Sequence, residues 1–354
     1  MDVGLIGLPR SGKTTVFNLL TGAGISTNPY GGEKLSHNAL MPIPDERLDL
    51  LSAMYHPKKT TPALLNVVDV PGLSQRDTGG ANRFLNDVRL VDALVHVVRG
   101  FSSDVDGPPH PAQDIEDMEL ELTLADMDLL EKRAQRIRTA KKPTRELQEE
   151  LALVERLLAA MEDGQRLTQV DLNPEEQREL SGYQFLTQKP MLCVLNLDDQ
   201  TFQSRVYPDQ QAVFDWALAK STLVVPMAGQ MEAEIKGLSE EDRLAFMQDL
   251  GIEEVGSARV AQAVYEKLGL ISFLTAGEDE VRAWTIAKGC QAKTAAGKIH
   301  SDIERGFIRA EVVAYADLCR QGSMVKAREA GLVRLEGKEY EMQDGDVVNF
   351  RFNV

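Results

Sequence analysis

The sequence predicts an α/β domain that is interrupted by a helical hairpin and followed by a compact α+β module. Three observations support this prediction. Strand-like and helix-like segments alternate over the first ~115 residues, as in a parallel sheet covered by helices. From about residue 115 to residue 167, leucine and methionine recur at helical spacing among many charged residues. After Gly269, short β-like runs separated by glycine turns replace the helical pattern.

Size and charge exclude several classes of protein. The 354 residues exceed one ordinary core and suggest two or three domains. The formal net charge of −16 disfavours non-specific binding of nucleic acid or an anionic membrane by the whole surface. No apolar run approaches the ~20 residues of a membrane span, and a first strand beginning at about Asp2 leaves no room for a signal peptide. With three widely separated cysteines, we expect reduced thiols in a cytoplasmic protein.

A glycine-rich loop joins the first predicted strand, Val3–Ile6, to the first predicted helix, Thr15–Leu20. The loop, Gly7–Thr14, matches the pattern G-x-x-x-x-G-K-[ST] of P-loop NTPases. In such a loop the backbone N–H groups turn inward around phosphate, and the next helix adds the positive end of its dipole. Lys13 is predicted to reach the β- and γ-phosphates, and the Thr14 hydroxyl to ligate Mg²⁺. The residues of this stretch predicted to contact the nucleotide are Leu8, Pro9, Arg10, Ser11, Gly12, Lys13, Thr14 and Thr15.

A second predicted strand, Leu64–Asp69, ends in an acid followed by Val-Pro-Gly. Asp69 is expected to hold a metal-bound water, and the Gly72 N–H is expected to meet the γ-phosphate. Lys13 and Gly72 are therefore the predicted catalytic groups, and Thr14 and Asp69 are the predicted Mg²⁺ ligands.

The residue after Gly72 is Leu73, where Ras-like enzymes have a glutamine that orients the attacking water. Leucine cannot hydrogen-bond to water. Either another group positions the nucleophile or turnover is slow.

Four residues at the end of a later buried strand, Asn196–Asp199, stand where GTPases place N-K-x-D. The acid of that motif accepts two hydrogen bonds from guanine, from a donor pair that adenine lacks. Asp199 would favour guanine, but Leu197 replaces the lysine that packs over the base, so these residues leave the choice of base open. After the next strand, Ala228 and Gly229 are predicted to supply backbone groups beside the base.

A long antiparallel helical hairpin is predicted between the two α/β stretches. Lys141-Lys142-Pro143 interrupts the helical pattern, and Thr144 is a good start for the second helix. The tip is basic, which allows contact with RNA or another acidic surface; a charge run is also typical of a solvated helix face. The basic residues of the tip are Lys132, Arg133, Arg136, Arg138, Lys141, Lys142 and Arg145.

Taken together, these residues resemble the YchF/Obg-like ATPase family, a branch of the Obg-related translation-factor P-loop NTPases. The resemblance covers nearly the whole chain. It includes the phosphate loop, the Asp69–Leu73 stretch with its hydrophobic last residue, the strand Val91–Arg99 and the helical insertion. The most specific similarity is to the family's TGS domain, in Phe273–Gly277, Val281–Ile286, Gly306–Glu311 and Gln343–Val354.

The resemblance implies the following architecture: a P-loop domain in residues 1–115 and 187–268, a coiled-coil arm in 116–186, and a β-grasp TGS domain in 269–354. It implies a nucleotidase that prefers ATP to GTP, uses Mg²⁺, and associates with ribosomes or ribosomal RNA through the arm and the TGS domain. We expect no membrane partner and no DNA specificity. Beyond the phosphate loop, the residues expected around the nucleotide are Phe101, Asn196, Leu197, Asp199, Ala228 and Gly229.

Two departures from the family pattern leave alternatives open. The family usually has glutamate where Asp199 stands, so a GTPase that reads guanine through Asp199 is the second hypothesis. The first switch has no threonine in register; Thr27 or Ser36 could substitute, and closure on Mg²⁺ stays open. Together with Leu73, this departure also fits a nucleotide-sensing scaffold with little hydrolysis. The chain could be a divergent paralogue.

Overall fold

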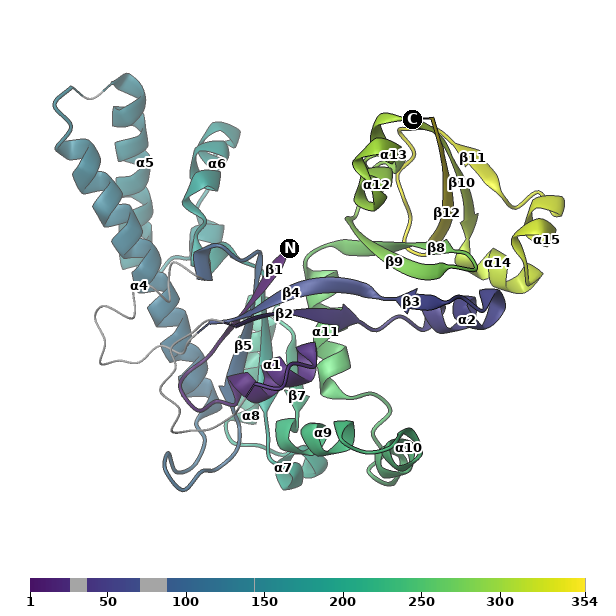
Figure 1. The fold of residues 1–354 in the computed structure, drawn as a ribbon. Coiled ribbons are helices and arrows are strands. Elements are labelled where there is room, and N and C mark those ends of the chain that lie inside the picture. The colour runs from purple at the N-terminus through teal and green to yellow at the C-terminus, as the bar shows by residue number, and fades with distance from the viewer. Residues whose placement is uncertain (26–36, 71–87, 143, 354) are drawn as a thin grey trace. The chain divides into compact units, whose positions relative to one another are not determined.

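The computed structural model describes residues 1–25, 37–70, 88–142 and 144–353 (Figure 1). The chain divides into two compact units. Unit 1 contains residues 1–39 and 67–256, and unit 2 contains residues 40–66 and 257–354. The three-segment domain scheme expected from the sequence stays a prediction. Four residues discussed above lie outside the described residues: Thr27 and Ser36 of the first switch, and Gly72 and Leu73 of the stretch after Asp69.

A six-stranded sheet in the order β2-β4-β1-β5-β6-β7 carries the core of unit 1. The pairs β1–β5, β5–β6 and β6–β7 are parallel, so the carboxyl ends of these strands lie at one edge. Every residue of β5 except the last is buried, as expected for a strand covered by helices on both faces. The strands are β1 Asp2–Ile6, β2 His37–Ile43, β4 Ala63–Asp69, β5 Ala93–Arg99, β6 Met191–Asn196 and β7 Val224–Met227.

The helices of unit 1 begin and end at recognisable signals. α1 ends at Gly22, which adopts the left-handed conformation, and α5 begins after Thr144, whose hydroxyl accepts a hydrogen bond from the Leu147 N–H. Among the described residues, no helix combines the length and apolar character needed to cross a membrane. The helices are α1 Lys13–Thr21, α4 Pro111–Arg138, α5 Arg145–Glu162, α6 Pro174–Leu180, α7 Asp199–Ser204, α8 Gln210–Lys220, α9 Gly229–Lys236 and α10 Glu240–Asp249. The next helix, α11 Gly256–Lys267, belongs to unit 2 except for its first residue.

α4 and α5 form the helical hairpin, which we call the arm, and they run side by side in Figure 1. Their apolar seam includes Leu130, Val154 and Leu157. The carboxylate of Glu150 is buried in the same seam. It accepts hydrogen bonds from the Arg133 guanidinium at 2.7 and 2.6 Å and from the Tyr183 hydroxyl at 2.5 Å. The arm is therefore held by an apolar seam and by one buried, fully paired acid.

At the base of the arm, Asp126 is fully buried and accepts hydrogen bonds from three other residues. Arg89 donates to it at 2.9 Å, the Leu186 N–H at 3.1 Å, and the N–H and hydroxyl of Thr187 at 2.9 Å each. These bonds join α4 to the segment that enters β6 and to the residues that precede β5. A buried charge with this many donors is stable because each lone pair is satisfied.

Unit 2 is a second six-stranded sheet, in the order β11-β10-β12-β8-β9-β3. β8 pairs antiparallel with β9 and parallel with β12, and α12 packs its alanines against Phe273 and Phe350. The strands are β3 Lys59–Thr61, β8 Leu270–Ala276, β9 Glu280–Ala287, β10 Phe307–Ala314, β11 Arg334–Glu336 and β12 Asp346–Phe352, and the helices are α2 Glu46–Tyr55, α12 Ala292–Ile299, α13 Ser301–Arg305, α14 Tyr315–Gln321 and α15 Met324–Glu329.

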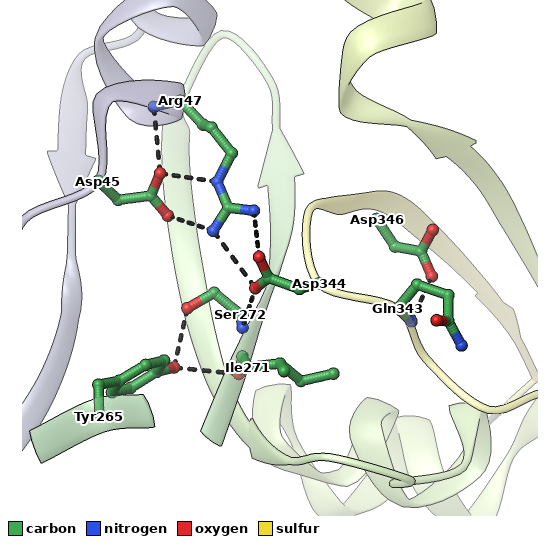
Figure 2. Close-up of polar contacts among 8 residues, drawn as sticks. All are labelled: Asp45, Arg47, Tyr265, Ile271, Ser272, Gln343, Asp344 and Asp346. Carbon is green, nitrogen blue, oxygen red and sulfur yellow. Dashed lines mark hydrogen bonds and ion pairs between the residues drawn. The ribbon is translucent and has the colours of Figure 1, made fainter. Parts of the chain in front are cut away.

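An ion-pair cluster attaches α2 to the C-terminal part of unit 2 (Figure 2). Asp45 caps α2 and also binds the Arg47 guanidinium, which in turn donates to Asp344 at 2.7 Å. Asp344 accepts a further hydrogen bond from the Ser272 N–H at 2.9 Å, and the Ser272 hydroxyl lies 2.8 Å from the Tyr265 hydroxyl. The chain around Arg47 is thereby fixed to strands that follow it by more than two hundred residues.

We expect Asp126→Ala to destabilise unit 1 by about 3–5 kcal/mol, because it leaves the partly buried guanidinium of Arg89 and two backbone N–H groups without their acceptor. The control is Asp128→Ala, two residues along α4, which removes only an exposed pair with Lys132 and should change stability by less than about 1 kcal/mol. Urea unfolding followed by circular dichroism measures both. Equal effects of the two substitutions would contradict the role of Asp126.

Candidate functional site

A cleft of ≈ 1210 Å³ opens in unit 1 next to the carboxyl ends of β5 and β6. This is the edge of a parallel sheet where α/β proteins bind ligands. Its walls come from α1 and the residues that follow it, from the loop after β5, from the β6–α7 junction and from α9. The lining residues are Gly12, Thr15, Asn18, Leu19, Gly22, Ala23, Gly24, Ile25, Phe101, Ser102, Asn196, Leu197, Asp198, Asp199, Gln200, Gln230, Ala233, Lys236 and Gly237.

The loop between β1 and α1 has the backbone geometry of a phosphate cradle. Gly7 and Gly12 have φ angles of 154° and 90°, and Arg10 between them has φ 64°. A Cβ on Gly7 would collide with the Val97 carbonyl, and one on Gly12 would collide with the Asn196 side-chain amide. Only glycine fits these two positions. Among the described residues, no side chain caps the start of α1, so its first N–H groups are available to an anion.

Asn196, the last residue of β6, ties this loop to the rest of the cleft. Its side-chain NH₂ donates to the Ser11 carbonyl at 3.1 Å, and its side-chain oxygen accepts from the Gly229 N–H at 3.1 Å. The side chain is buried, so these bonds are made in place of bonds to water. One amide therefore joins the phosphate loop to the start of α9.

Lys13 and Asp69 provide opposite charges beside the loop. The Lys13 ammonium donates to the Gly7 carbonyl at 3.4 Å; burial lowers its pKa, and the charge of Asp69 acts in the opposite direction. Burial raises the pKa of the Asp69 carboxyl, against the effects of Lys13 and His37. Each group has lost part of its hydration, so each gains from a ligand that brings the opposite charge.

The residues present fit a magnesium ion. Oδ1 of Asp69 is buried and has no hydrogen-bond partner among the described residues. Within the same part of the chain, no cluster of three or more His, Cys, Asp or Glu side chains could hold a metal alone. Mg²⁺ is ordinarily bound by one or two carboxylates together with phosphate oxygens and waters. A lone carboxylate next to a phosphate loop matches that donor set, and Thr14 adds a hydroxyl at the start of α1.

His96, in the middle of β5, does not add a charge to this site. Its side chain is buried, and neither ring nitrogen has a partner among the residues that the structure describes. Burial, with a smaller contribution from Lys13, lowers the pKa of His96 to about 3. The imidazole is therefore neutral near neutral pH.

At the other end of the cleft, Leu197 is buried and Asp199 is exposed. Asp198 caps α7 by accepting a hydrogen bond from the Thr201 N–H at 2.8 Å, and both Asp198 and Asp199 line the cleft. Partial burial and the nearby carboxylates of Glu234 and Asp198 raise the pKa of Asp199.

The structure brings six of the predicted nucleotide-contacting residues together as lining of the cleft: Gly12, Thr15, Phe101, Asn196, Leu197 and Asp199. Leu8, Pro9, Arg10, Ser11, Lys13 and Thr14 belong to the adjoining phosphate loop rather than to the lining, and Ala228 is buried behind Gly229, whose N–H is bound by Asn196. Gly72 lies outside the described residues, so its predicted role stays a prediction.

Two further residues of the cleft wall, Asn18 and Lys236, were not predicted from the sequence. The Asn18 side chain binds both the N–H and the carbonyl of Ile25, at 3.1 and 2.7 Å, and so fixes the chain that leaves α1. The Lys236 ammonium donates to the carbonyls of Asn18 and Leu19 at 3.2 and 3.1 Å. Both lie at ordinary helical positions in no motif, and nothing in the sequence pairs residues 218 positions apart.

We expect Gly12→Ala to weaken nucleoside triphosphate binding at least about tenfold, because the new Cβ strains a left-handed position and displaces Asn196. Gly24→Ala is the control: Gly24 lines the same cleft, but an added Cβ there meets nothing within 4 Å. Isothermal titration calorimetry measures both. Normal affinity in Gly12→Ala would mean that the loop does not cradle phosphate.

Comparisons with known proteins agree with this geometry. Residues 2–142 match the family described as 50S ribosome-binding GTPase, and residues 270–353 match the C-terminal YchF-GTPase family, described as a protein of unknown function (DUF933). The structure of the Schizosaccharomyces pombe YchF GTPase is similar, with a TM-score of 0.85 and 30% identity over 99% of this chain and 97% of that one. These matches confirm the predicted fold class.

The whole chain is also similar to curated relatives. It is 42% identical to the ribosome-binding ATPase YchF of Haemophilus ducreyi over 360 residues, which cover 99% of each protein. It is 41% identical to the ribosome-binding ATPase YchF of Bacillus subtilis over 364 residues, which cover both proteins completely. Identity at this level over the full length confirms the resemblance inferred from the sequence, and the chain belongs to the YchF family.

Proposed function

We propose that the protein is a Mg²⁺-dependent ATPase with slow intrinsic turnover that acts on ribosomes as a translation or stress-response switch. The observation that carries the proposal is the phosphate loop, Gly7–Thr14, folded into a left-handed cradle and fixed by Asn196 at the edge of a ligand-sized cleft. The names of the relatives, ribosome-binding ATPases, support the choice of substrate and partner.

The chain's own residues suit hydrolysis by in-line attack of water on the γ-phosphate. Lys13 and the loop N–H groups hold the phosphates and stabilise the charge that develops on their oxygens. Thr14 and Asp69 would hold Mg²⁺, which would neutralise part of the charge of the phosphates. No covalent intermediate is required, because positioning and electrostatics supply the catalysis. Gly72 is proposed to complete the γ-phosphate site.

One feature of the cleft end that is expected to hold the base favours ATP, and another leaves a GTPase as the alternative. Leu197 is buried, so it offers the base an apolar wall instead of the lysine stem found in N-K-x-D. Asp199 lines the cleft, and partial burial with the nearby carboxylates of Glu234 and Asp198 raises its pKa. A GTPase that uses Asp199 remains the second candidate because the carboxylate stands at the guanine-reading position.

We expect the protein to bind ATP more tightly than GTP, and Lys13→Ala to weaken ATP binding at least about tenfold by removing a cation from the phosphates. Titration of both nucleotides with Mg²⁺ into the wild type, Lys13→Ala and the exposed control Lys132→Ala measures this. ATP binding tenfold weaker than GTP, about 1.4 kcal/mol, would select the GTPase. If no phosphate is released, either with or without ribosomes, the nucleotide-sensing scaffold is the correct hypothesis.

The ribosome contact is proposed for the arm and for the C-terminal module, which we assign to the TGS type. Four of the seven basic residues at the arm tip form ion pairs with acids of the arm itself. The pairs are Lys132–Asp128, Arg133–Glu150, Arg138–Glu155 and Arg145–Glu149. The other three, Arg136, Lys141 and Lys142, are exposed and have no ion-pair partner among the described residues. We therefore assign the contact with ribosomal RNA to these three.

Arg136→Glu/Lys141→Glu/Lys142→Glu should weaken co-sedimentation with ribosomes at moderate salt, because three phosphate-binding cations become anions. The charge-conserving triple variant Arg136→Lys/Lys141→Arg/Lys142→Arg is the matched control and should sediment like the wild type. ATP turnover without ribosomes should be the same in all three proteins. Equal sedimentation of the charge-reversed and control variants would remove the arm tip from the interface.

A further inference from the structure

The side chain of Arg10, in the phosphate loop, is bound by a residue outside the loop. It lies in the left-handed conformation between the two loop glycines, and its guanidinium forms an ion pair with Asp106. About half of the Arg10 side chain is exposed, 52%, against 23% for Asp106. An ion pair exposed to this degree contributes little to stability, so an anion of higher charge, such as a phosphate, can replace the Asp106 carboxylate as the partner of Arg10.

Asp106 belongs to a loop that is itself firmly built. Its N–H donates to the Ser103 hydroxyl at 2.9 Å, and that hydroxyl donates back to the carboxylate at 3.2 Å. The Arg99 guanidinium binds the carbonyls of Phe101 and Gly107 at 3.0 and 2.9 Å. The carboxylate is thus held at a fixed point on the loop that also supplies a wall of the cleft.

A further cation beside the phosphates would favour the reaction proposed for this site. Negative charge is spread over the oxygens of the transferred phosphoryl group, and Lys13 is the only other cationic residue in the phosphate loop. The chain has Leu73 where a glutamine orients water in Ras-like enzymes, so part of the usual catalytic set is missing. A planar guanidinium with five donors suits phosphate oxygens better than an ammonium does.

We propose that Arg10 is an arginine finger supplied by the phosphate loop itself. Asp106 holds its guanidinium until a nucleoside triphosphate binds, and the phosphate oxygens then replace the carboxylate as its partner. This inference rests on the proposed ATPase function. In the reaction, the water oxygen forms a bond to the γ-phosphorus, and the bond to the β–γ bridging oxygen breaks with its electron pair leaving on ADP. The proton of the water passes to the phosphate or to solvent. Arg10 stays protonated throughout and stabilises the charge on the phosphate oxygens.

The competing explanation is that the Arg10–Asp106 pair only tethers the two loops. The two explanations predict different effects of substituting Arg10 and Asp106 on the rate of ATP hydrolysis. If the pair is a tether, Arg10→Ala and Asp106→Asn break the same bond and impair the enzyme alike. If Arg10 is a finger, Arg10→Ala removes the catalytic group, whereas Asp106→Asn releases it.

The test is single-turnover ATP hydrolysis by the full-length wild type, Arg10→Ala, Arg10→Lys, Asp106→Asn and Arg10→Ala/Asp106→Asn. We expect the rate to fall at least about tenfold in Arg10→Ala, to be poorly restored by Arg10→Lys, and to equal or exceed the wild type in Asp106→Asn. The double variant should match Arg10→Ala. The control Arg138→Ala breaks a similarly exposed ion pair in the arm and should leave the rate unchanged.

A second readout is the affinity for ADP with and without aluminium fluoride, which mimics the transferred phosphoryl group. Arg10→Ala should bind ADP within about threefold of the wild type yet lose the gain in affinity that aluminium fluoride gives, because only the transition state uses the finger. A normal rate in Arg10→Ala, or parallel losses in Arg10→Ala and Asp106→Asn, would overturn the finger. Absence of ATP binding and turnover in the wild type would instead overturn the proposed function, and the finger with it.

Discussion

The site depends on one buried amide. Asn196 reaches from the end of β6 to the Ser11 carbonyl on one side and to the Gly229 N–H on the other. The space it occupies is the space that a side chain at position 12 would need, so the glycine and the asparagine require each other. A shift of this amide would therefore disturb the phosphate loop and the start of α9 together.

The electrostatics of the site follow from the same burial. Lys13 and Asp69 are partly desolvated charges, and His96 is kept neutral by its apolar surroundings. Burial of these two charges has an unfavourable desolvation cost, which a phosphate and a divalent cation can relieve. Arg10 differs because it stays near the surface and is neutralised by Asp106. The loop thus combines one buried cation, suited to binding, with one exposed cation that can change partners.

Much of this arrangement could be predicted from local patterns. The phosphate loop, the acid at the end of β4 and the helical hairpin each have a signal within a short window, because loop chemistry and helix periodicity are local properties. The cleft walls provided by Asn18 and Lys236, and the Arg10–Asp106 pair, depend on contacts between distant residues that no window contains. At the arm tip, the ion pairs of Arg133 and Arg138 also join residues on facing helices, whereas those of Lys132 and Arg145 are made with acids one helical turn away.

The position of β3 has a consequence for how the protein is made. This short strand pairs with β9, and the Thr61 hydroxyl binds a Glu280 carboxylate 219 residues later in the chain. At about 5–20 residues per second, a ribosome needs roughly 10–45 s to synthesise the partner. During that time the backbone of β3 is an unpaired edge, which invites pairing with other nascent chains. Lys58 and Lys59 place two charges at this edge, and charged edge residues are a known protection against such aggregation.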